Sequence, residues 1–487
     1  MKILFVTSEA HPLIKTGGLG DVSGSLPAAL QELQQDVRLV LPAYPQAVAR
    51  LSGATSGSRF TLTGTGNEIT LLEGKMPGSN VPVWLIDAPA YFNRNGGPYG
   101  TPGGDWPDNA ERFALFARAV VEIAMDRAGL RWQPDVVHCN DWQAGLVPAL
   151  LDDEHQRPAT LFTIHNLAYQ GLFPWETFAR LGLPHELWHM EAMEFHGQFS
   201  FIKGGLAFAD HLTTVSPTYA REIRTAAFGY GLEGLLNHRA NRLTGILNGI
   251  DYTIWDPASD PLIPAQFTAH DLAGKAHNKE VLQKRFGLAI NSTAPLLGVV
   301  GRMVEQKGID LVADTIPSLL NDGAQLTILG SGAYHYEHQL RELAARYPRQ
   351  IGLHIGYDEP LAHLIEAGSD IFLMPSRFEP CGLNQIYSLR YGTLPVVRRT
   401  GGLADTVVDT GPTTFNAGKA TGFIFDAPSS KALYSAVQRA LGYYRQPTQW
   451  QRLIGTAMAQ DFSWHASAQR YLALYQQVTE ERSSLRG

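Results

Sequence analysis

The residue with the clearest chemical potential is Glu379, a carboxylate that follows a short buried strand. Residues 371–374 (IFLM) are all apolar, and the turn RFEPCG at 377–382 separates them from a predicted helix over 383–391, closed by a glycine. In open α/β sheets ligands bind beyond the carboxyl ends of strands, where helix N-termini leave backbone N–H groups free. Glu379 is therefore placed to act on a bound ligand, or else it caps the helix.

Two cations hold an equivalent position earlier in the second half of the chain. The strand predicted at 296–300 (LLGVV) is followed by Arg302 and Lys307. A guanidinium fork and an ammonium point charge can grip a diphosphate, although such a pair can also belong to a solvated loop. The sequence has neither D-x-D nor zinc-type His/Cys spacing, so we expect no metal and no cofactor.

A glycine-rich loop, KTGGLGDV at 15–22, lies between a predicted strand at 2–7 and a helix that runs toward residue 33. This layout is typical of phosphate cradles, although the glycines could serve close packing alone. RTGGLADTV at 399–407 repeats the basic-Thr-Gly-Gly-Leu-x-Asp pattern after a strand at 394–397. Two similar α/β domains facing across a cleft would present both loops to one ligand.

Polar residues also follow strands in the first half of the chain. The strand at 135–138 leads into Cys139-Asn140-Asp141, and the strand at 160–164 leads into His165-Asn166. Two polar clusters at strand ends fit one crevice, although each histidine alone is more often structural. In the second half, Gly330 and Gly332 after a strand at 325–329 would let a backbone approach a ligand closely.

Strands alternate with helical segments, which predicts doubly wound parallel sheets. Further strands are expected at 37–41, 211–215, 243–247 and 351–355, and residues 51–86 read as an antiparallel addition. We expect a long loop at 91–111, helices at 112–128 and 450–485, and a domain boundary near residue 250.

Composition limits the class of protein. The 487 residues predict two or three domains, and 44% hydrophobic with 17% charged residues is typical of a soluble globular chain. A net charge of −7 argues against a general nucleic-acid binder. Two cysteines are too few for a disulfide framework. The N-terminal sequence does not resemble a signal peptide, and no apolar run reaches the length of a membrane span. We therefore expect a cytoplasmic protein without membrane partners.

Together these residues favour transfer from a nucleotide-diphosphate sugar. Breaking the bond to the diphosphate places negative charge on the leaving group, which Arg302 and Lys307 could stabilise. Positive charge develops on the sugar ring, which Glu379 could stabilise. The glycine-rich loops and a two-domain cleft would exclude water.

Motifs across nearly the whole chain resemble those of bacterial glycogen synthases and plant starch synthases, the ADP-glucose-dependent glucan synthases of glycosyltransferase family 5. The matching segments are KTGGL at 15–19, HNLAYQG at 165–171, NGID at 248–251, QKG at 306–308, SRFEPCGL at 376–383, RTGGL at 399–403 and DFSW at 461–464. The resemblance departs at Gly20, where many relatives have Ala, and at Cys139-Asn140, where relatives often have Ala-His. The second departure puts any role for residue 140 in doubt.

The resemblance implies a GT-B fold, with two Rossmann-like doubly wound domains across a deep cleft. It implies an N-terminal, acceptor-side domain over 1–250, a C-terminal, nucleotide-sugar domain over 251–455, and a helix over 456–487 that crosses back to the first domain. The implied reaction moves glucose from ADP-glucose to the non-reducing end of an α-1,4-glucan, with retention at the anomeric carbon. ADP-glucose and glycogen or a maltooligosaccharide would be its partners.

Roles carried over by resemblance complete the set of candidate residues. The catalytic candidates are Glu379, Lys307, Arg302, Lys15, His165 and Asp141. The candidates for substrate binding are Lys15, Gly17, Gly18, Asp21, His165, Asn248, Arg302, Lys307, Gly330, Tyr357, Glu379, Cys381, Gly382, Leu383, Thr400 and Gly401. Two other functions remain open: a sugar-nucleotide epimerase of the same fold and a non-catalytic glucan- or nucleotide-binding regulator.

Overall fold

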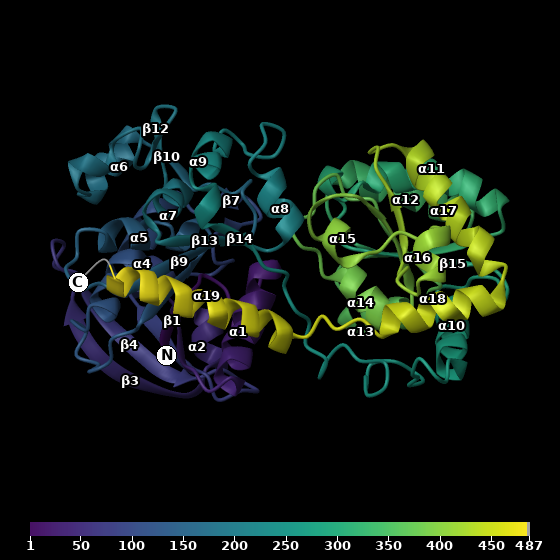
Figure 1. Ribbon diagram of the computed structural model, residues 1–487, viewed down its shortest axis with the longest axis horizontal. Coiled ribbons are helices and arrows are strands. Elements are labelled where there is room, and N and C mark those ends of the chain that lie inside the picture. The colour runs from purple at the N-terminus through teal and green to yellow at the C-terminus, as the bar shows by residue number, and fades with distance from the viewer. Residues whose placement is uncertain (485–487) are drawn as a thin grey trace. The chain divides into compact units, whose positions relative to one another are not determined.

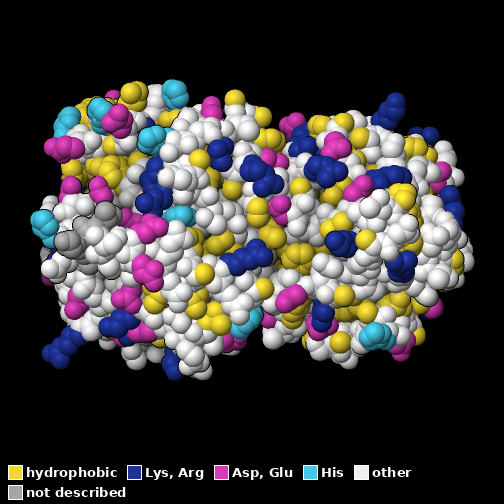
Figure 2. All heavy atoms as spheres, in the orientation of Figure 1, with side chains coloured by type: hydrophobic (Ala, Val, Ile, Leu, Met, Phe, Trp, Pro, Cys, Tyr) yellow, Lys and Arg dark blue, Asp and Glu magenta, His cyan; other side chains and the backbone are white. Residues whose placement is uncertain are grey.

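The computed structural model of the chain describes residues 1–484, which form two compact units (Figure 1). The first unit contains Met1–Gly249 and the C-terminal segment from Trp464, and the second contains Ile250–Ser463. On the face shown in Figure 2, basic and acidic side chains are interspersed, so local charges rather than one broad patch mark this face.

Unit 1 is built on a nine-stranded sheet with the order β14-β13-β9-β8-β1-β2-β5-β4-β3. All neighbours pair in parallel except β3 with β4 and β4 with β5. Its strands are β1 (Lys2–Val6), β2 (Asp36–Pro42), β3 (Ser52–Thr61), β4 (Glu68–Lys75), β5 (Pro82–Asp87), β8 (Val136–Asn140), β9 (Ala159–Ile164), β13 (His211–Thr214) and β14 (Leu243–Gly245). The strand order reverses between β1 and β8, which makes their carboxyl ends the topological switch point of this sheet.

Helices and two small sheets surround the main sheet of unit 1. The helices are α1 (Gly18–Glu32), α2 (Pro45–Arg50), α3 (Pro89–Phe92), α4 (Asn109–Ala124), α5 (Leu146–Leu151), α6 (Trp175–Leu181), α7 (Phe201–Phe208), α8 (Pro217–Glu222), α9 (Glu233–His238) and α19 (Trp464–Ser484), with 3-10 turns η1 (Trp142–Ala144), η2 (His185–Leu187) and η3 (Ala240–Arg242). The small sheets consist of β10 (Leu172–Pro174), β11 (Glu194–Phe195) and β12 (Gln198–Ser200), and of β6 (Gly100–Thr101) with β7 (Gly104–Asp105).

Unit 2 has a six-stranded parallel sheet with the order β17-β16-β15-β18-β19-β20. Its strands are β15 (Leu296–Val300), β16 (Gln325–Gly330), β17 (Ile351–Ile355), β18 (Ile371–Met374), β19 (Leu394–Arg398) and β20 (Phe423–Phe425). Its helices are α10 (Ala273–Arg285), α11 (Ile309–Asn321), α12 (Tyr334–Arg346), α13 (Glu359–Gly368), α14 (Asn384–Arg390), α15 (Gly401–Thr406), α16 (Pro412–Asn416), α17 (Ser430–Tyr444) and α18 (Pro447–Met458), with the 3-10 turn η4 (Glu305–Lys307). Here the order reverses between β15 and β18.

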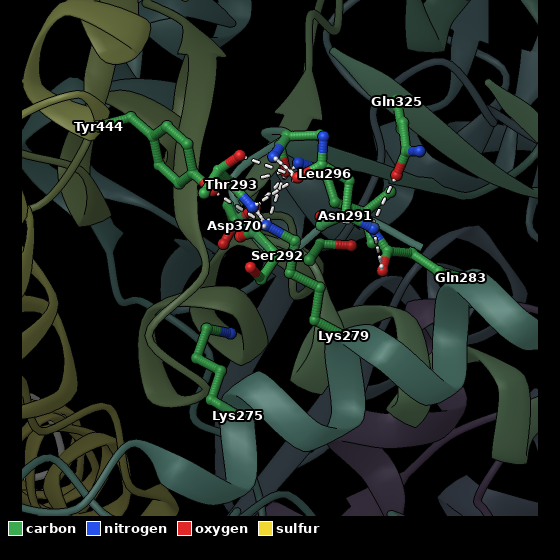
Figure 3. Close-up of polar contacts among 12 residues, drawn as sticks. Lys275, Lys279, Gln283, Asn291, Ser292, Thr293, Leu296, Gln325, Asp370 and Tyr444 are labelled. Atoms are coloured by element: carbon green, nitrogen blue, oxygen red, sulfur yellow. Dashed lines mark hydrogen bonds and ion pairs between the residues drawn. The ribbon is translucent and has the colours of Figure 1, made fainter. Parts of the chain in front are cut away.

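A buried lysine fixes the amino ends of β15 and β18 (Figure 3). Lys279, which is 6% exposed, donates from Nζ to Asp370 Oδ2 at 2.7 Å, to the Ala294 carbonyl at 2.6 Å and to the Tyr444 hydroxyl at 2.9 Å. The same carboxylate oxygen accepts from the Leu296 amide at 2.8 Å. Because a buried charge is stabilised only when it is paired and hydrogen-bonded, this network holds the two central strands in one register.

The C-terminal helix α19 belongs to unit 1 and lies against α1 (Figure 1, yellow end of the colour scale). Tyr471 and Tyr475 on α19 are fully buried, and the Tyr475 hydroxyl lies 2.7 Å from Nδ1 of His138 on β8. His138 therefore serves the packing of α19 on the sheet.

Most predicted strands are confirmed, and the differences have local causes. Residues 450–485 do not form one helix, because α18 ends at Met458 and α19 begins at Trp464. The expected start of the last helix at 456 thus falls inside α18, and residues 485–487 lie outside the described part. The segment 91–111 is not a plain loop, since it holds the end of α3, the β6–β7 hairpin and the start of α4. In the segment 51–86, β5 pairs in parallel with β2 as well as antiparallel with β4.

Candidate functional site

In unit 2, the switch point brings Glu379 and Lys307 together. Arg302 and Lys307 follow β15, Glu379 follows the adjacent strand β18, and Lys307 Nζ lies 2.5 Å from Glu379 Oε2. The Ser376 hydroxyl donates to the same carboxylate oxygen at 3.0 Å, and Glu379 is only 6% exposed. The carboxylate is thus held in one position by a cation and a hydroxyl.

The two loops that carry these residues are locked to one another. Arg377 makes a bidentate ion pair with Asp310, with distances of 2.8 and 2.6 Å, and its amide donates to the Gln306 carbonyl at 2.8 Å. The Gln306 side chain donates to the Phe378 carbonyl at 3.2 Å. Because a paired guanidinium fork fixes both distance and orientation, Glu379 and Lys307 sit on a rigid frame.

Arg302 stands apart from this frame. Its side chain is exposed, and within residues 1–484 it makes no hydrogen bond or ion pair. One of the two predicted cations is therefore already engaged by a carboxylate, and the other is available to a ligand.

Packing requires glycine in one of the two Thr-Gly-Gly segments but not in the other. A Cβ on Gly401, which has φ +44°, would lie 1.9 Å from the Glu379 carbonyl oxygen, and a Cβ on Gly402 would lie 2.0 Å from that of Cys381. These glycines let the Glu379 loop rest on the start of α15. A Cβ on Gly17 or Gly18 would meet nothing within 4 Å, so no part of the described chain requires a glycine there.

We expect this contrast to appear in substitutions. Gly402→Ala should lower the thermal midpoint by about 4 °C or more, because its Cβ overlaps backbone that cannot move alone. Gly18→Ala lies in the first turn of α1, where alanine is favoured, so the midpoint should not fall. If a ligand approaches the Gly17–Gly18 backbone, kcat/KM should still drop about tenfold or more. Calorimetry and steady-state kinetics on both variants check this; full activity of Gly18→Ala would contradict a ligand role for the loop.

Among the other candidates in unit 2, two glycines are required by the local packing or backbone conformation. A Cβ added at Gly330 would lie 1.9 Å from the Gly301 carbonyl oxygen, and Gly382 adopts φ +74° in the turn after Glu379. Tyr357, after β17, is 83% exposed, and its hydroxyl donates to Glu359 at 3.3 Å.

The remaining three candidates of unit 2 belong to helix starts or to the core. Cys381 is buried and forms no disulfide among the described residues, Leu383 is the N-cap residue of α14 and Thr400 is the N-cap residue of α15. All three therefore lie at the ligand edge of the sheet, although burial limits what Cys381 can touch.

In unit 1, a buried carboxylate that the sequence analysis missed organises the glycine loop. Glu9, 3% exposed, accepts from the Thr16 hydroxyl at 2.6 Å, from the Gly17 amide at 3.2 Å and from the Tyr99 hydroxyl at 2.6 Å. Its position, three residues after the end of β1 and before the glycine-rich loop, could have identified it from the sequence. Lys15 and Asp21 form an ion pair of 2.6 Å across the loop and are both partly exposed.

His165 lies at the same edge of the sheet as that loop. Its Nε2 is 2.9 Å from Asn140 Oδ1, and its amide donates to Asp141 Oδ1 at 2.7 Å. Burial lowers the pKa of His165 to about 3 and raises the pKa of Asp141 to about 7, against the backbone hydrogen bonds that Asp141 accepts from His165 and Asn166. Asp141 is therefore a positioning group for the turn after β9. Asn248, 6% exposed, also belongs to unit 1, and its Oδ1 has no hydrogen-bond partner among the described residues.

The lowered pKa of His165 predicts that its imidazole stays neutral from pH 8 down to about pH 4. Below about pH 6.5 the unfolded chain would bind a proton on this residue, whereas the folded chain would not. The contribution of His165 to the free energy of unfolding is therefore fully present above that pH and is lost as the pH falls toward 3. Nitrogen-15 NMR of histidine-labelled protein across this pH range checks this. A His165 resonance that titrates near pH 6.5 would contradict the prediction.

Unit 1 also carries a cavity of about 540 Å³ beside the turn that follows His165. Six aromatic residues line it: Trp106, Trp142, Tyr169, Phe173, Phe195 and Tyr230. Gln170 contributes a buried Oε1 that has no partner among residues 1–484. An aromatic wall with a few polar groups suits a sugar, which presents apolar ring faces and hydroxyl groups together.

The described residues were searched for groups of metal-ligating side chains and for helices able to span a membrane. They contain no group of three or more His, Cys, Asp or Glu side chains that could hold a metal ion. None of the described helices combines the length and the apolar character needed to cross a bilayer.

Comparisons with known proteins agree over nearly the whole chain. The family described as "Starch synthase catalytic domain" matches residues 2–238, and "Glycosyl transferases group 1" matches residues 281–452. Glycogen synthase from Thioalkalivibrio sulfidiphilus is 59% identical over 98% of this chain and 100% of the relative. This chain belongs to the glycogen synthase and starch synthase family. Glycogen synthase 1 from Methylococcus capsulatus is 58% identical over 98% of this chain and 97% of its own length.

A solved structure supports the same family. The catalytic domain of starch synthase IV from Arabidopsis thaliana, bound to ADP and acarbose, is 34% identical, with a TM-score of 0.88 over 98% of this chain and 99% of that chain. The predicted GT-B fold and the predicted family are thereby confirmed. The roles of individual residues in this synthase remain predictions. Glu9 and the residues of the aromatic cavity are added to the candidate functional residues.

Proposed function

We propose that this synthase transfers the glucosyl group of ADP-glucose to the non-reducing end of an α-1,4-glucan, with retention at the anomeric carbon. The observation that carries the proposal is the group at the switch point of unit 2. There Glu379 is buried and paired with Lys307, while Arg302 is exposed and without a partner among the described residues. The starch synthase IV structure holds ADP, which supports an ADP-based donor.

Arg302 and Lys307 would bind the diphosphate, and Glu379 would face the glucose. Lys307 contacts Glu379, so one ammonium group would link the leaving-group end of the site to the sugar end. As the bond to the diphosphate breaks, negative charge grows on the phosphate beside Lys307 and positive charge grows on the ring beside Glu379. Lys307 and Glu379 would stabilise these two charges from positions that they already hold, so the side chains would not need to reorganise during the reaction.

Unit 1 would supply the rest of the donor contacts and the acceptor. Lys15, the amides of Gly17 and Gly18, and Asp21 would contact the donor, because the open space around the two glycines lets a ligand reach the backbone. The neutral His165 and the unpartnered Asn248 Oδ1 would make hydrogen bonds to the sugar. Unit 1 is thus the proposed acceptor side and unit 2 the proposed nucleotide-sugar side.

The aromatic cavity is the proposed acceptor site, and Tyr169, which is 54% exposed, offers the test. Tyr169→Ala should raise the KM for glycogen about five- to tenfold, because stacking on a sugar face is lost, with ADP affinity unchanged. Tyr169→Phe keeps the ring and should retain most of the acceptor affinity. A KM for glycogen that stays at the wild-type value in Tyr169→Ala would remove this residue from the acceptor site.

Retention at the anomeric carbon is compatible with a front-face displacement, in which the leaving phosphate takes the proton of the acceptor hydroxyl. A double displacement would need Glu379 or Asp141 as a free nucleophile. Glu379 is ion-paired with Lys307, and Asp141 accepts a hydrogen bond from the His165 amide. Because Arg302 and Lys307 would already stabilise the leaving phosphate, we favour the front-face route, which leaves Glu379 an electrostatic role.

The experiment that tests the function is ADP release from ADP-glucose with glycogen present. Parallel reactions omit glycogen or replace the donor with UDP-glucose. Glycogen-dependent release with little turnover of UDP-glucose supports the proposal and its donor. Release without glycogen would indicate hydrolysis, and an isomerised sugar without release would favour the epimerase. We further propose that the reaction takes place in the cytoplasm, consistent with two buried cysteines that form no disulfide among the described residues.

A further inference from the structure

One loop of unit 1, residues 93–108 between α3 and α4, contributes to the wall of the aromatic cavity. Asp105 and Trp106 of this loop line the cavity, together with Asn109 at the start of α4. Tyr99 is not one of the lining residues, but its carbonyl accepts from the Trp106 amide and from the Asn109 side chain, both at 2.9 Å. The backbone of Tyr99 is therefore fixed to two residues of the proposed acceptor site.

The side chain of Tyr99 contacts the support of the glycine-rich loop. Its hydroxyl donates to Glu9 Oε1 at 2.6 Å and lies 2.7 Å from the Ser8 hydroxyl. Glu9 accepts in turn from the Thr16 hydroxyl at 2.6 Å and from the Gly17 amide at 3.2 Å. One residue thus joins the wall of the cavity to the carboxylate that holds the glycine-rich loop.

A ligand in the cavity can restrict the loop that carries Tyr99. The tip of this loop consists of the two-residue strands β6 and β7, and it is exposed from residue 101 to residue 105. Exposed segments with few buried contacts open most easily in a folded protein. A glucan that packs against Trp106 would therefore order the loop, and a second ligand that needs the same order would bind more tightly.

We propose that Tyr99 is a positioning residue that couples the two substrate sites of unit 1. A glucan in the aromatic cavity fixes Tyr99, and Tyr99 fixes Glu9 and the glycine-rich loop. The inference rests on the proposed function, in which the cavity takes the acceptor and this loop contacts the donor. Because coupling of two binding equilibria is reciprocal, each substrate should raise the affinity for the other by the same factor.

Calorimetric titrations of the full-length protein with ADP and maltopentaose test the proposal. ADP carries no glucosyl group to transfer, and it represents the donor. The Kd for ADP is measured without maltopentaose and with saturating maltopentaose, and the ratio of the two values is the coupling factor. We expect a factor of about five or more for the wild type, the lower end of typical couplings.

Tyr99→Phe keeps the ring but removes the hydroxyl that donates to Glu9, so its coupling factor should fall below about two. Its affinity for maltopentaose alone should stay within about twofold of the wild type, because Tyr99 does not line the cavity. Tyr91→Phe is the matched control, since Tyr91 lies on α3 and its hydroxyl makes no hydrogen bond among residues 1–484. This control should keep the coupling factor of the wild type.

Glu9→Gln breaks the same link from the other side. An amide nitrogen replaces one of the two carboxylate oxygens, so the side chain can no longer accept from both Tyr99 and the glycine-rich loop at every contact. Its coupling factor should also fall, and this variant decides the outcome if Tyr99→Phe does not fold.

The other outcomes would overturn the proposal. They are a wild-type factor of one, an unchanged factor in Tyr99→Phe and Glu9→Gln, and an equal loss of coupling in Tyr91→Phe. A purely structural role of Tyr99 would lower the thermal midpoint and both single-ligand affinities but leave the factor unchanged. If the wild type failed to bind ADP or maltopentaose by itself, the single-ligand titrations would show it, and the proposed function would fall together with this inference.

Discussion

Replacing Glu379 by Gln should lower kcat about 100- to 1000-fold while the Kd for ADP stays within about twofold of the wild type. Glutamine keeps the size of the side chain and can still accept from Ser376, which donates to Glu379 at 3.0 Å. It cannot carry the negative charge that would stabilise a positively charged sugar ring. ADP lacks the sugar, and its anionic phosphates gain nothing from Glu379, so ADP affinity has no reason to fall.

The measurement is a pair of experiments on one protein preparation. Steady-state ADP release gives kcat, and calorimetry gives the Kd for ADP. Glu305→Gln is the matched control, because Glu305 is an exposed carboxylate on the loop that carries Lys307. The control should retain wild-type kcat. Equal losses of kcat and of ADP affinity in Glu379→Gln would show that the carboxylate supports the structure of the site and not its transition state.

Arg302→Ala should weaken ADP binding between about 10-fold and 100-fold, the range expected for loss of a charge-assisted contact to phosphate. The substitution should not lower the thermal midpoint, because the Arg302 side chain is exposed and makes no hydrogen bond or ion pair within the described chain. This separates it from Lys307→Ala, which would leave the buried Glu379 carboxylate without its ion pair at 2.5 Å and should also destabilise unit 2.

Arg349→Ala serves as the control for Arg302→Ala. Arg349 is exposed as well, but it precedes β17 and so lies at the amino end of the parallel strands, away from the ligand edge. Its removal should leave the Kd for ADP unchanged. If both variants weaken ADP binding equally, general positive charge attracts the nucleotide, and the specific role of Arg302 is refuted.

Much of the fold was predictable because its strands are short, buried and apolar. The predicted strand at 296–300 and the predicted strand at 351–355 agree with β15 and β17 to the residue. The break between α18 and α19 was not predicted, since Asp461-Phe462-Ser463 interrupts two helical patterns that look continuous in sequence. β20 was missed because a strand of three residues carries too little periodicity to detect.

The sequence by itself determined the family and the strand-end positions of Arg302, Lys307 and Glu379, because motifs and apolar runs are local properties of the chain. Only the tertiary structure decided that Lys307 and Glu379 form an ion pair, since the adjacency of β15 and β18 depends on the order of strands in the sheet. It also decided that two similar Thr-Gly-Gly segments differ. Gly401 and Gly402 are covered by the Glu379 loop, while Gly17 and Gly18 face open space. Local sequence can repeat a pattern, but which atoms come to lie against it is set by packing between distant segments.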